Sequence, residues 1–241
     1  MTGFVDIHTH VLPGVDDGAK DFAQGLALLR QAYDNGTRTM VFTPHYRGKY
    51  RANTPEMLKE RFEEFCGAAA LELPEMKLYL GQEVYYDTGT PEALAEGRAL
   101  PLNDTGYAML EFSPKSTPED IQKGIDAFLY YGYHPVIAHV ERYTHFRRAE
   151  VLVEYALARG ALLQLNADSV LGKNGLAVKQ FCHKLLKSGR VSFIASDAHD
   201  TAKRPPLLRE CFLYVHKKYG KEYALRLFYE NPVAMLENQE F

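Results

Sequence analysis

Short apolar runs alternate with longer amphipathic stretches along the whole chain. The runs lie at residues 3–5, 39–42, 78–80, 108–110, 135–138, 161–165 and 191–195. Between them, apolar residues recur at three- and four-residue spacing, which predicts helices over 21–33, 55–69, 118–131, 149–159, 176–188 and 206–219. About seven strands that alternate with helices predict parallel pairing with crossover connections.

Helix-start signals support these boundaries. Thr54 stands directly before Pro55, and Thr117 directly before Pro118. A capping hydroxyl followed by a first-turn proline is typical of a helix N-terminus. Near the end of the chain, Asn231-Pro232 predicts the start of a last short helix.

This alternation predicts an α/β fold in one domain over residues 1–241. A (β/α) barrel runs to roughly 250 residues, which suits the chain length. A doubly wound open sheet would fit the alternation nearly as well. Such a sheet normally concentrates its ligands at one switch point, however, whereas polar candidates here follow nearly every strand.

Metal-ligating residue types close most of the apolar runs. The first run leads into Asp6-Ile7-His8-Thr9-His10, where alternation in an extended strand puts Asp6, His8 and His10 on one face. The later runs end in His45, Glu83, Glu111, His139, Asp197 and His199. In a parallel barrel the carboxyl ends of the strands meet at one mouth, so we expect these side chains to converge there.

The donor set is imidazole and carboxylate without thiolate, which suits Mn, Fe, Co or Zn. Eight or nine such residues exceed what one ion needs, so more than one cation is expected. Clustered metal ions are typical of enzymes that hydrolyse phosphate esters. The three cysteines, Cys66, Cys182 and Cys211, lack C-x-x-C spacing, and we interpret them as reduced packing residues.

Two arginines follow the histidine motifs. Arg142 lies three residues after His139, and Arg204 follows His199. A guanidinium fork matches two phosphate oxygens, so both are candidate catalytic, phosphate-binding residues; surface salt bridges are the alternative. The basic segment 47–51 could contact an anionic partner, although such short runs more often form solvated loops.

Composition limits the location and the partners. Hydrophobic residues make up 46% and charged residues 24%, which is typical of a globular domain. A formal charge of -3 argues against a broad nucleic-acid-binding face. Apolar runs stay well short of the 18 or so residues of a transmembrane helix, and the start lacks a signal-peptide pattern. We therefore expect a cytoplasmic protein that is not itself a membrane protein and does not bind nucleic acid.

The ordered motifs D-I-H-T-H, D-D-G, P-H, G-Q-E, L-E-F, A-H-V-E-R-Y, S-D-A-H and R-P-P resemble the polymerase and histidinol phosphatase (PHP) superfamily. Within it, the chain is most similar to the bacterial capsule-type manganese-dependent protein-tyrosine phosphatases. The resemblance implies a single PHP domain, a distorted TIM-like (β/α)7 barrel, that holds three metal ions, with Mn²⁺ expected.

By motif, the resemblance also implies a ligand set. One ion would be held by His8, His10, Glu83 and Asp197, a second by Glu83, Glu111 and His139, and a third by Asp17, His45 and His199. Asp16 competes with Asp17 for the last position, because the two are adjacent in a turn-like D-D-G.

The implied substrate is phosphotyrosine on a protein, expected to be a bacterial tyrosine kinase that controls capsule or exopolysaccharide synthesis. Three alternatives stay open at this point: a histidinol-phosphate phosphatase, a PHP-type phosphodiesterase or nuclease, and a non-catalytic module that binds a phosphorylated partner. A cysteine followed six positions later by arginine does not occur, so tyrosine phosphatase activity would require metal.

Overall fold

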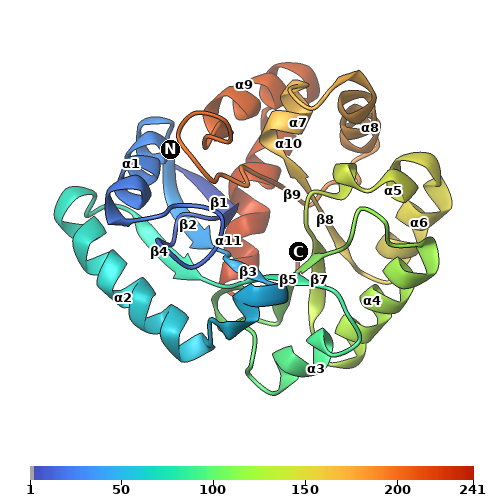
Figure 1. The fold of residues 1–241 in the computed structure, drawn as a ribbon. Helices are drawn as coiled ribbons and strands as arrows, with labels where there is room; N and C mark the ends of the chain where they lie inside the picture. Colours follow the sequence, from blue (N-terminus) through green and yellow to red (C-terminus); the bar gives the residue numbers. More distant parts are fainter. Residues whose placement is uncertain (1–2) are drawn as a thin grey trace.

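The computed structural model describes residues 3–241. Its centre is formed by parallel strands (Figure 1). The strands are β1 (Phe4–Thr9), β2 (Thr37–Phe42), β3 (His45–Tyr46), β4 (Lys77–Leu80), β5 (Glu83–Tyr85), β6 (Tyr107–Glu111), β7 (His134–Ile137), β8 (Leu162–Asn166) and β9 (Phe193–Ala195). The hydrogen-bonded order is β1-β2-β4 in one sheet and β3-β5-β6-β7-β8-β9 in the other.

The two sheets join into a closed barrel of seven strand positions. Since β2 pairs with β4 and β3 pairs with β5, β2/β3 and β4/β5 each form one interrupted strand. The ends of β1 and β9 also meet. Thr9 forms a parallel bridge with Ala198, and the Asp197 N–H donates to the His8 carbonyl at 2.9 Å. The predicted (β/α)7 barrel is confirmed, and the open-sheet alternative is wrong.

The two strand interruptions place functional residues side by side. Pro44, which lacks an N–H, separates β2 from β3. Gly81 separates β4 from β5 at a point where a β-carbon would lie 3.0 Å from the Leu102 Cα atom. After both breaks the chain resumes with His45 paired in register to Glu83.

Helices form the outer layer of the barrel (Figure 1). They are α1 (Phe22–Asp34), α2 (Pro55–Glu72), α3 (Thr90–Ala95), α4 (Pro118–Tyr130), α5 (Thr144–Arg148), α6 (Glu150–Ala158), α7 (Ala167–Leu171), α8 (Leu176–Lys187), α9 (Leu208–Tyr219), α10 (Lys221–Leu225) and α11 (Asn231–Leu236), with short turns η1 (Gly48–Ala52), η2 (Leu102–Asp104), η3 (Val140–Arg142) and η4 (Arg226–Glu230). The six longer helices and α11 match the prediction. The helix start predicted at Thr117-Pro118 is confirmed, and Thr117 also forms a reciprocal capping box with Asp120 on α4.

The core separates into an inner part and outer parts. One cluster includes Ile7, Val41, Val136 and Phe193 from strands around the barrel, together with Met235 of α11. It therefore fills the barrel interior, and the C-terminal helix closes it. Neighbouring strand positions point outward and pack under the helices, as period-two alternation requires.

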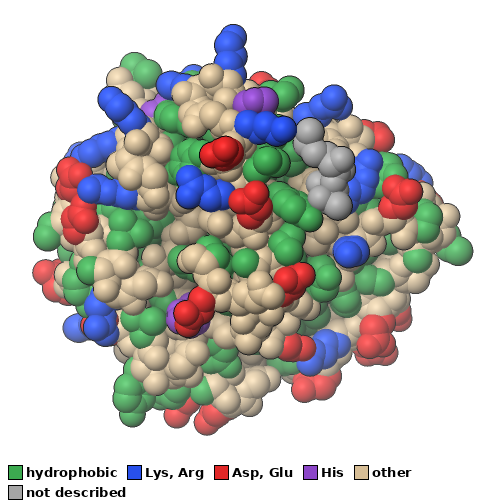
Figure 2. Space-filling view, turned by 180° about the vertical axis from the view of Figure 1, so that it is seen from behind, with side chains coloured by type: hydrophobic (Ala, Val, Ile, Leu, Met, Phe, Trp, Pro, Cys, Tyr) green, Lys and Arg blue, Asp and Glu red, His purple; other side chains and the backbone are tan. Residues whose placement is uncertain are grey.

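The exterior agrees with the composition. On the face opposite to that of Figure 1, acidic and basic side chains are interspersed (Figure 2). Of the helices within residues 3–241, none has the length and apolarity needed to cross a membrane.

The three cysteines are free, with Cys182 and Cys211 buried and Cys66 half-buried, as expected for reduced packing residues.

Candidate metal centre

Nine of the residues singled out in the sequence meet at the carboxyl ends of the strands. Their nitrogen and oxygen atoms form four overlapping groups, and within each group the atoms lie within 4.8 Å of one another. The groups are His10, Asp17, His45 and His199; His8, His10 and Asp197; His8, Glu83 and His139; and His45, Glu83 and Glu111. These groups contain all nine expected ligands, although they divide them differently from the three sets that the resemblance implies.

Asp6 does not join the two histidines of β1. The pairing of β1 with β2 shifts in register between Asp6 and Thr9. Such an irregularity re-aims the side chains that follow it. Asp6 Oδ1 instead accepts the Ser196 N–H at 3.0 Å, whereas His8 Nε2 and His10 Nε2 lie 3.3 Å apart and face the same point.

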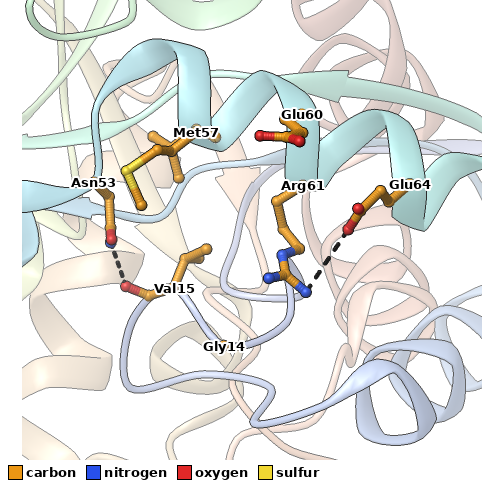
Figure 3. Close-up of a pocket in the computed structure, with 8 residues that line it drawn as sticks. Gly14, Val15, Asn53, Met57, Glu60, Arg61 and Glu64 are labelled. Carbon is orange, nitrogen blue, oxygen red and sulfur yellow. Dashed lines mark hydrogen bonds and ion pairs between the residues drawn. The ribbon is translucent and has the colours of Figure 1, made fainter.

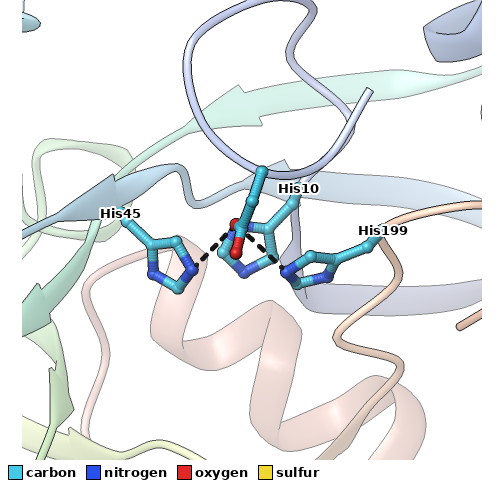
Figure 4. Close-up of side chains that lie close together, drawn as sticks. His10, His45 and His199 are labelled. Carbon is cyan, nitrogen blue, oxygen red and sulfur yellow. Dashed lines mark ion pairs between the residues drawn. The ribbon is translucent and has the colours of Figure 1, made fainter. Parts of the chain in front are cut away.

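Asp17, rather than Asp16, faces the cluster. Figure 4 shows the imidazoles of His10, His45 and His199 arranged around a common centre. Asp17 Oδ1 lies 3.1 Å from His45 Nε2 and 3.5 Å from His199 Nε2. Hydrogen bonds from these two imidazoles lower the pKa of Asp17 far below its usual value.

Asp16 has a supporting position behind the cluster. Its Oδ2 lies 2.6 Å from His10 Nδ1 and accepts the His45 N–H at 3.1 Å, while its Oδ1 accepts the Gly18 N–H. A carboxylate on the far nitrogen of an imidazole fixes the ring and its tautomer, so that the other nitrogen is free to bind a metal. Asp16 thus orients His10 and holds the loop that carries Asp17.

The Asp17 loop is anchored on its other side to Asn53, which lies between η1 and α2. Asn53 Nδ2 donates to the Val15 carbonyl at 2.5 Å (Figure 3). A cavity of about 230 Å³ lies between this loop and α2. Its lining contains none of the nine clustered residues, so we assign it no part in the chemistry.

Unpartnered buried atoms test whether the cluster fits metal ions. His45 Nδ1 and Glu83 Oε2 lie 2.8 Å apart, yet neither has a hydrogen-bond partner with acceptable geometry, and both are buried. His139 Nδ1 is also buried without a hydrogen-bond partner, and His199 Nε2 is buried with only Asp17 Oδ1 nearby, at 3.5 Å. Because buried polar groups are nearly always satisfied, unpartnered nitrogen and oxygen atoms such as His45 Nδ1 and Glu83 Oε2, which lie next to each other, fit bound cations. The residues therefore fit a metal cluster.

Two of the cluster residues have strained backbones. His139 has φ of 34° and Asp197 has φ of 54°, in the left-handed region that residues other than glycine seldom adopt. Strain of this kind costs roughly 1–3 kcal/mol and persists where the surroundings enforce it, often at functional sites. Here it turns each side chain toward the cluster at the end of its strand.

The electrostatics agree with a site that needs cations. Burial raises the pKa of Glu111 to about 7, and the nearby charge of Glu83 adds to this rise. Burial alone would lower the pKa of His45, but Glu83 and Asp17 outweigh it and raise the pKa to about 9. Burial and the Arg142 charge lower the pKa of His139 to about 4. A metal ion would compete with the proton on His45 and stabilise the ionised form of Glu111.

Strand β8 contributes no expected ligand, yet it holds ligands from three other strands. Gln164 Oε1 accepts the His139 N–H at 2.7 Å and lies 3.2 Å from His8 Nδ1. Gln164 Nε2 donates to Asn166 Oδ1, and Asn166 Nδ2 donates to Asp197 Oδ2 at 2.8 Å. Sequence reasoning missed both residues, although Q-L-N at the end of an apolar run has the same alternation as the histidine motif.

Replacing Gln164 with leucine is expected to weaken metal binding by about 10- to 100-fold, the usual cost of removing a side chain that holds metal-binding residues in place. Isothermal titration of the metal-free protein measures this. Gln82→Leu is the matched control, because Gln82 is also buried but accepts the Leu100 N–H instead. Equal losses in both variants would reduce Gln164 to a packing residue.

Arg142 and Arg204 both contact Asp197. Their Nη2 atoms lie 2.8 Å and 2.5 Å from Asp197 Oδ2, while Asp197 Oδ1 faces the histidines. The two arginine side chains are 37% and 33% exposed, so their remaining N–H groups are open to a ligand. The structure thus brings both to the edge of the cluster.

Arg47 is a third arginine at this edge, and sequence reasoning placed it in an ordinary basic loop. It donates to Glu111 Oε1 at 3.0 Å, and its Nη2 lies 3.0 Å from His45 Nε2. The only sequence signal for a role of Arg47 is its position two residues after the metal-ligand candidate His45. Three guanidinium groups therefore surround the carboxylate and imidazole cluster.

Comparison with known proteins agrees with this geometry. Residues 4–237 match the family described as capsular polysaccharide synthesis, CpsB/CapC. The chain belongs to the CpsB/CapC family. It is 32% identical to the tyrosine-protein phosphatase CpsB of Streptococcus pneumoniae over 240 residues, which cover 98% of this chain and 99% of that protein. YwqE of Bacillus subtilis, also a tyrosine-protein phosphatase, is 32% identical over 235 residues, covering 98% and 92%.

The chain is also similar in structure to a solved member of this family. That structure is one of the crystal structures of YwqE from Bacillus subtilis and CpsB from Streptococcus pneumoniae, which are described as unique metal-dependent tyrosine phosphatases. The superposition has a TM-score of 0.92 at 32% identity and covers 98% of this chain and 96% of that chain. The expected resemblance to the capsule-type phosphatases is confirmed.

Proposed function

We propose that this CpsB/CapC family member is a metal-dependent protein-tyrosine phosphatase that hydrolyses phosphotyrosine monoesters. The observation that carries the proposal is the convergence of nine imidazole and carboxylate side chains with arginines at one barrel mouth. Relatives that align over nearly their whole length are tyrosine-protein phosphatases. The same convergence disfavours a purely binding module, which would not need several shared metal ligands.

Each group of residues has a proposed role. The metal ligands are His8, His10, Asp17, His45, Glu83, Glu111, His139, Asp197 and His199. Bound divalent ions would supply Lewis acidity and lower the pKa of a coordinated water. Arg142 and Arg204 would bind the phosphoryl oxygens through their exposed N–H groups and stabilise the charge that develops during hydrolysis.

We propose Mn²⁺ as the native ion and three ions as the full complement. Glu83 takes part in two of the four atom groups, and so do His8, His10 and His45. Such sharing favours several ions bridged by common ligands over one. Imidazole and carboxylate also bind Fe, Co and Zn, so elemental analysis of protein purified without added metal is the measurement that identifies the native ion.

The proposed partner is a phosphorylated bacterial tyrosine kinase that regulates capsule or exopolysaccharide synthesis. The family description refers to capsular polysaccharide synthesis, which supports this pathway. A cytoplasmic location is part of the proposal, because three free cysteines suit a reducing compartment.

A substrate panel tests the proposal against its enzyme alternatives. The protein with Mn²⁺ is assayed on a phosphotyrosine peptide, on histidinol phosphate and on bis-nitrophenyl phosphate. The proposal expects the highest kcat/KM for the phosphotyrosine peptide. Preference for histidinol phosphate or for the diester would instead establish the corresponding alternative.

A cysteine-free variant is expected to keep near-normal turnover. Burial raises the pKa of the Cys66 thiol to about 11, and it raises those of Cys182 and Cys211 well above the usual range, so all three stay protonated at neutral pH. Phosphotyrosine hydrolysis by Cys66→Ser, Cys182→Ala, Cys211→Ala protein measures this. A phosphocysteine intermediate in the wild-type protein would contradict the proposed chemistry.

A further inference from the structure

A groove of about 500 Å³ borders the candidate metal centre next to β3 and β5. It is lined by Arg47, Gly48, Lys49, Tyr50, Arg51, Tyr85 and Asp87. The first five come from the segment that follows His45, and the last two from the end of β5 and the loop beyond it. The proposed hydrolysis does not account for this groove.

The groove is continuous with the metal centre. Arg47 lines it and also donates to Glu111 Oε1 at 3.0 Å. The Tyr50 ring stacks on the His45 imidazole, with centroids 6.0 Å apart and planes 23° apart. Residues next to a phosphotyrosine held at the centre would therefore reach this groove.

The lining carries an excess of positive charge. Arg47, Lys49 and Arg51 line the groove together with one carboxylate, Asp87, which pairs with Arg51, while Arg47 pairs with Glu111 of the metal centre. This local excess has the opposite sign to the net charge of the chain, which is -3. Lys49 Nζ lies 5.1 Å from the centre of the Tyr50 ring, and the Arg51 guanidinium lies 5.3 Å from that of Tyr46. Cations held over aromatic rings form a surface complementary to carboxylates.

We infer that this groove binds the substrate residues that flank the phosphotyrosine and selects acidic side chains at those positions. The inference rests on the proposed function, since it names the peptide class that the same centre accepts. Lys49 and Arg51 are the specificity-determining residues. Both are exposed, so each acts through a screened charge and adds a several-fold preference.

Two phosphotyrosine peptides test the inference, identical except for glutamate or lysine on both sides of the phosphotyrosine. For the wild-type protein at low salt, kcat/KM is expected to be about three- to tenfold higher for the glutamate peptide, and the ratio should fall at high salt. The double variant Lys49→Glu, Arg51→Glu should reverse the preference.

The double variant Lys123→Glu, Lys187→Glu is the matched control. It changes the net charge by the same amount through exposed lysines on α4 and α8. It should keep the wild-type ratio, and an equal shift in both double variants would assign the effect to net charge and overturn the inference. Equal efficiency of the wild-type protein on the two peptides would overturn the groove assignment while the phosphatase proposal stands. If neither peptide is hydrolysed, the proposed function fails and the groove assignment fails with it.

Discussion

Replacing Glu83 with glutamine is expected to lower kcat/KM for phosphotyrosine by at least about 10³-fold. Glu83 takes part in two of the four atom groups, and its carboxylate is buried among His8, His45 and His139. Glutamine keeps the shape but removes the negative charge that would offset two cations. Bound metal contributes several kcal/mol to such reactions, and each 1.36 kcal/mol or so corresponds to tenfold in rate.

Metal content by elemental analysis and steady-state kinetics on the same sample measure this effect. Glu75→Gln is the matched control, because Glu75 accepts a hydrogen bond from Tyr33 at an exposed position. We expect the control to keep both its metal and its activity. Full metal content and normal turnover in Glu83→Gln would remove Glu83 from the centre.

The barrel was predictable because its strands and longer helices leave clear periodic patterns. Prediction failed for short elements such as α3 and α7, which span six and five residues. Helices of that length have no full amphipathic repeat and depend on tertiary packing, so a sequence pattern cannot reveal them. The register shift in β1 that separates Asp6 from His8 and His10 is equally invisible to simple alternation.

The candidate site was predictable where residue type alone indicates metal chemistry. Histidine and carboxylate at strand ends are distinctive, whereas Gln164 and Asn166 resemble ordinary strand residues until their contacts are known. Asp16 and Asp17 differ only in the direction that the loop gives each side chain. Arg47 looked like part of a solvated basic run, because its approach to Glu111 depends on strand order.

Arg142→Ala and Arg204→Ala are each expected to lose about 10²–10³-fold in kcat/KM while they retain their metal ions. This is the scale for removing one donor that stabilises transition-state charge. In either variant Asp197 Oδ2 keeps the other arginine and the Asn166 amide, so the ligand stays in place. Lysine should rescue only part of the loss, because a point charge cannot reproduce the two-bond fork.

Metal content and vanadate affinity separate this role from an indirect one. Arg148→Ala, on the exposed side of α5, is the matched control and should resemble the wild-type protein. Normal metal content together with weakened vanadate binding in an alanine variant identifies the replaced arginine as a phosphate-binding residue. Wild-type efficiency in both variants would return Arg142 and Arg204 to the salt-bridge interpretation.

The clustered residues are expected to hydrolyse phosphotyrosine only through bound metal ions. Hydrolysis of a phosphotyrosine peptide is measured with one protein sample before chelation, after chelation and after Mn²⁺ is returned. We expect activity to disappear with the metal while the protein stays folded, and to return in proportion to the ions bound. Undiminished hydrolysis by the metal-free protein would contradict metal-dependent catalysis at this centre.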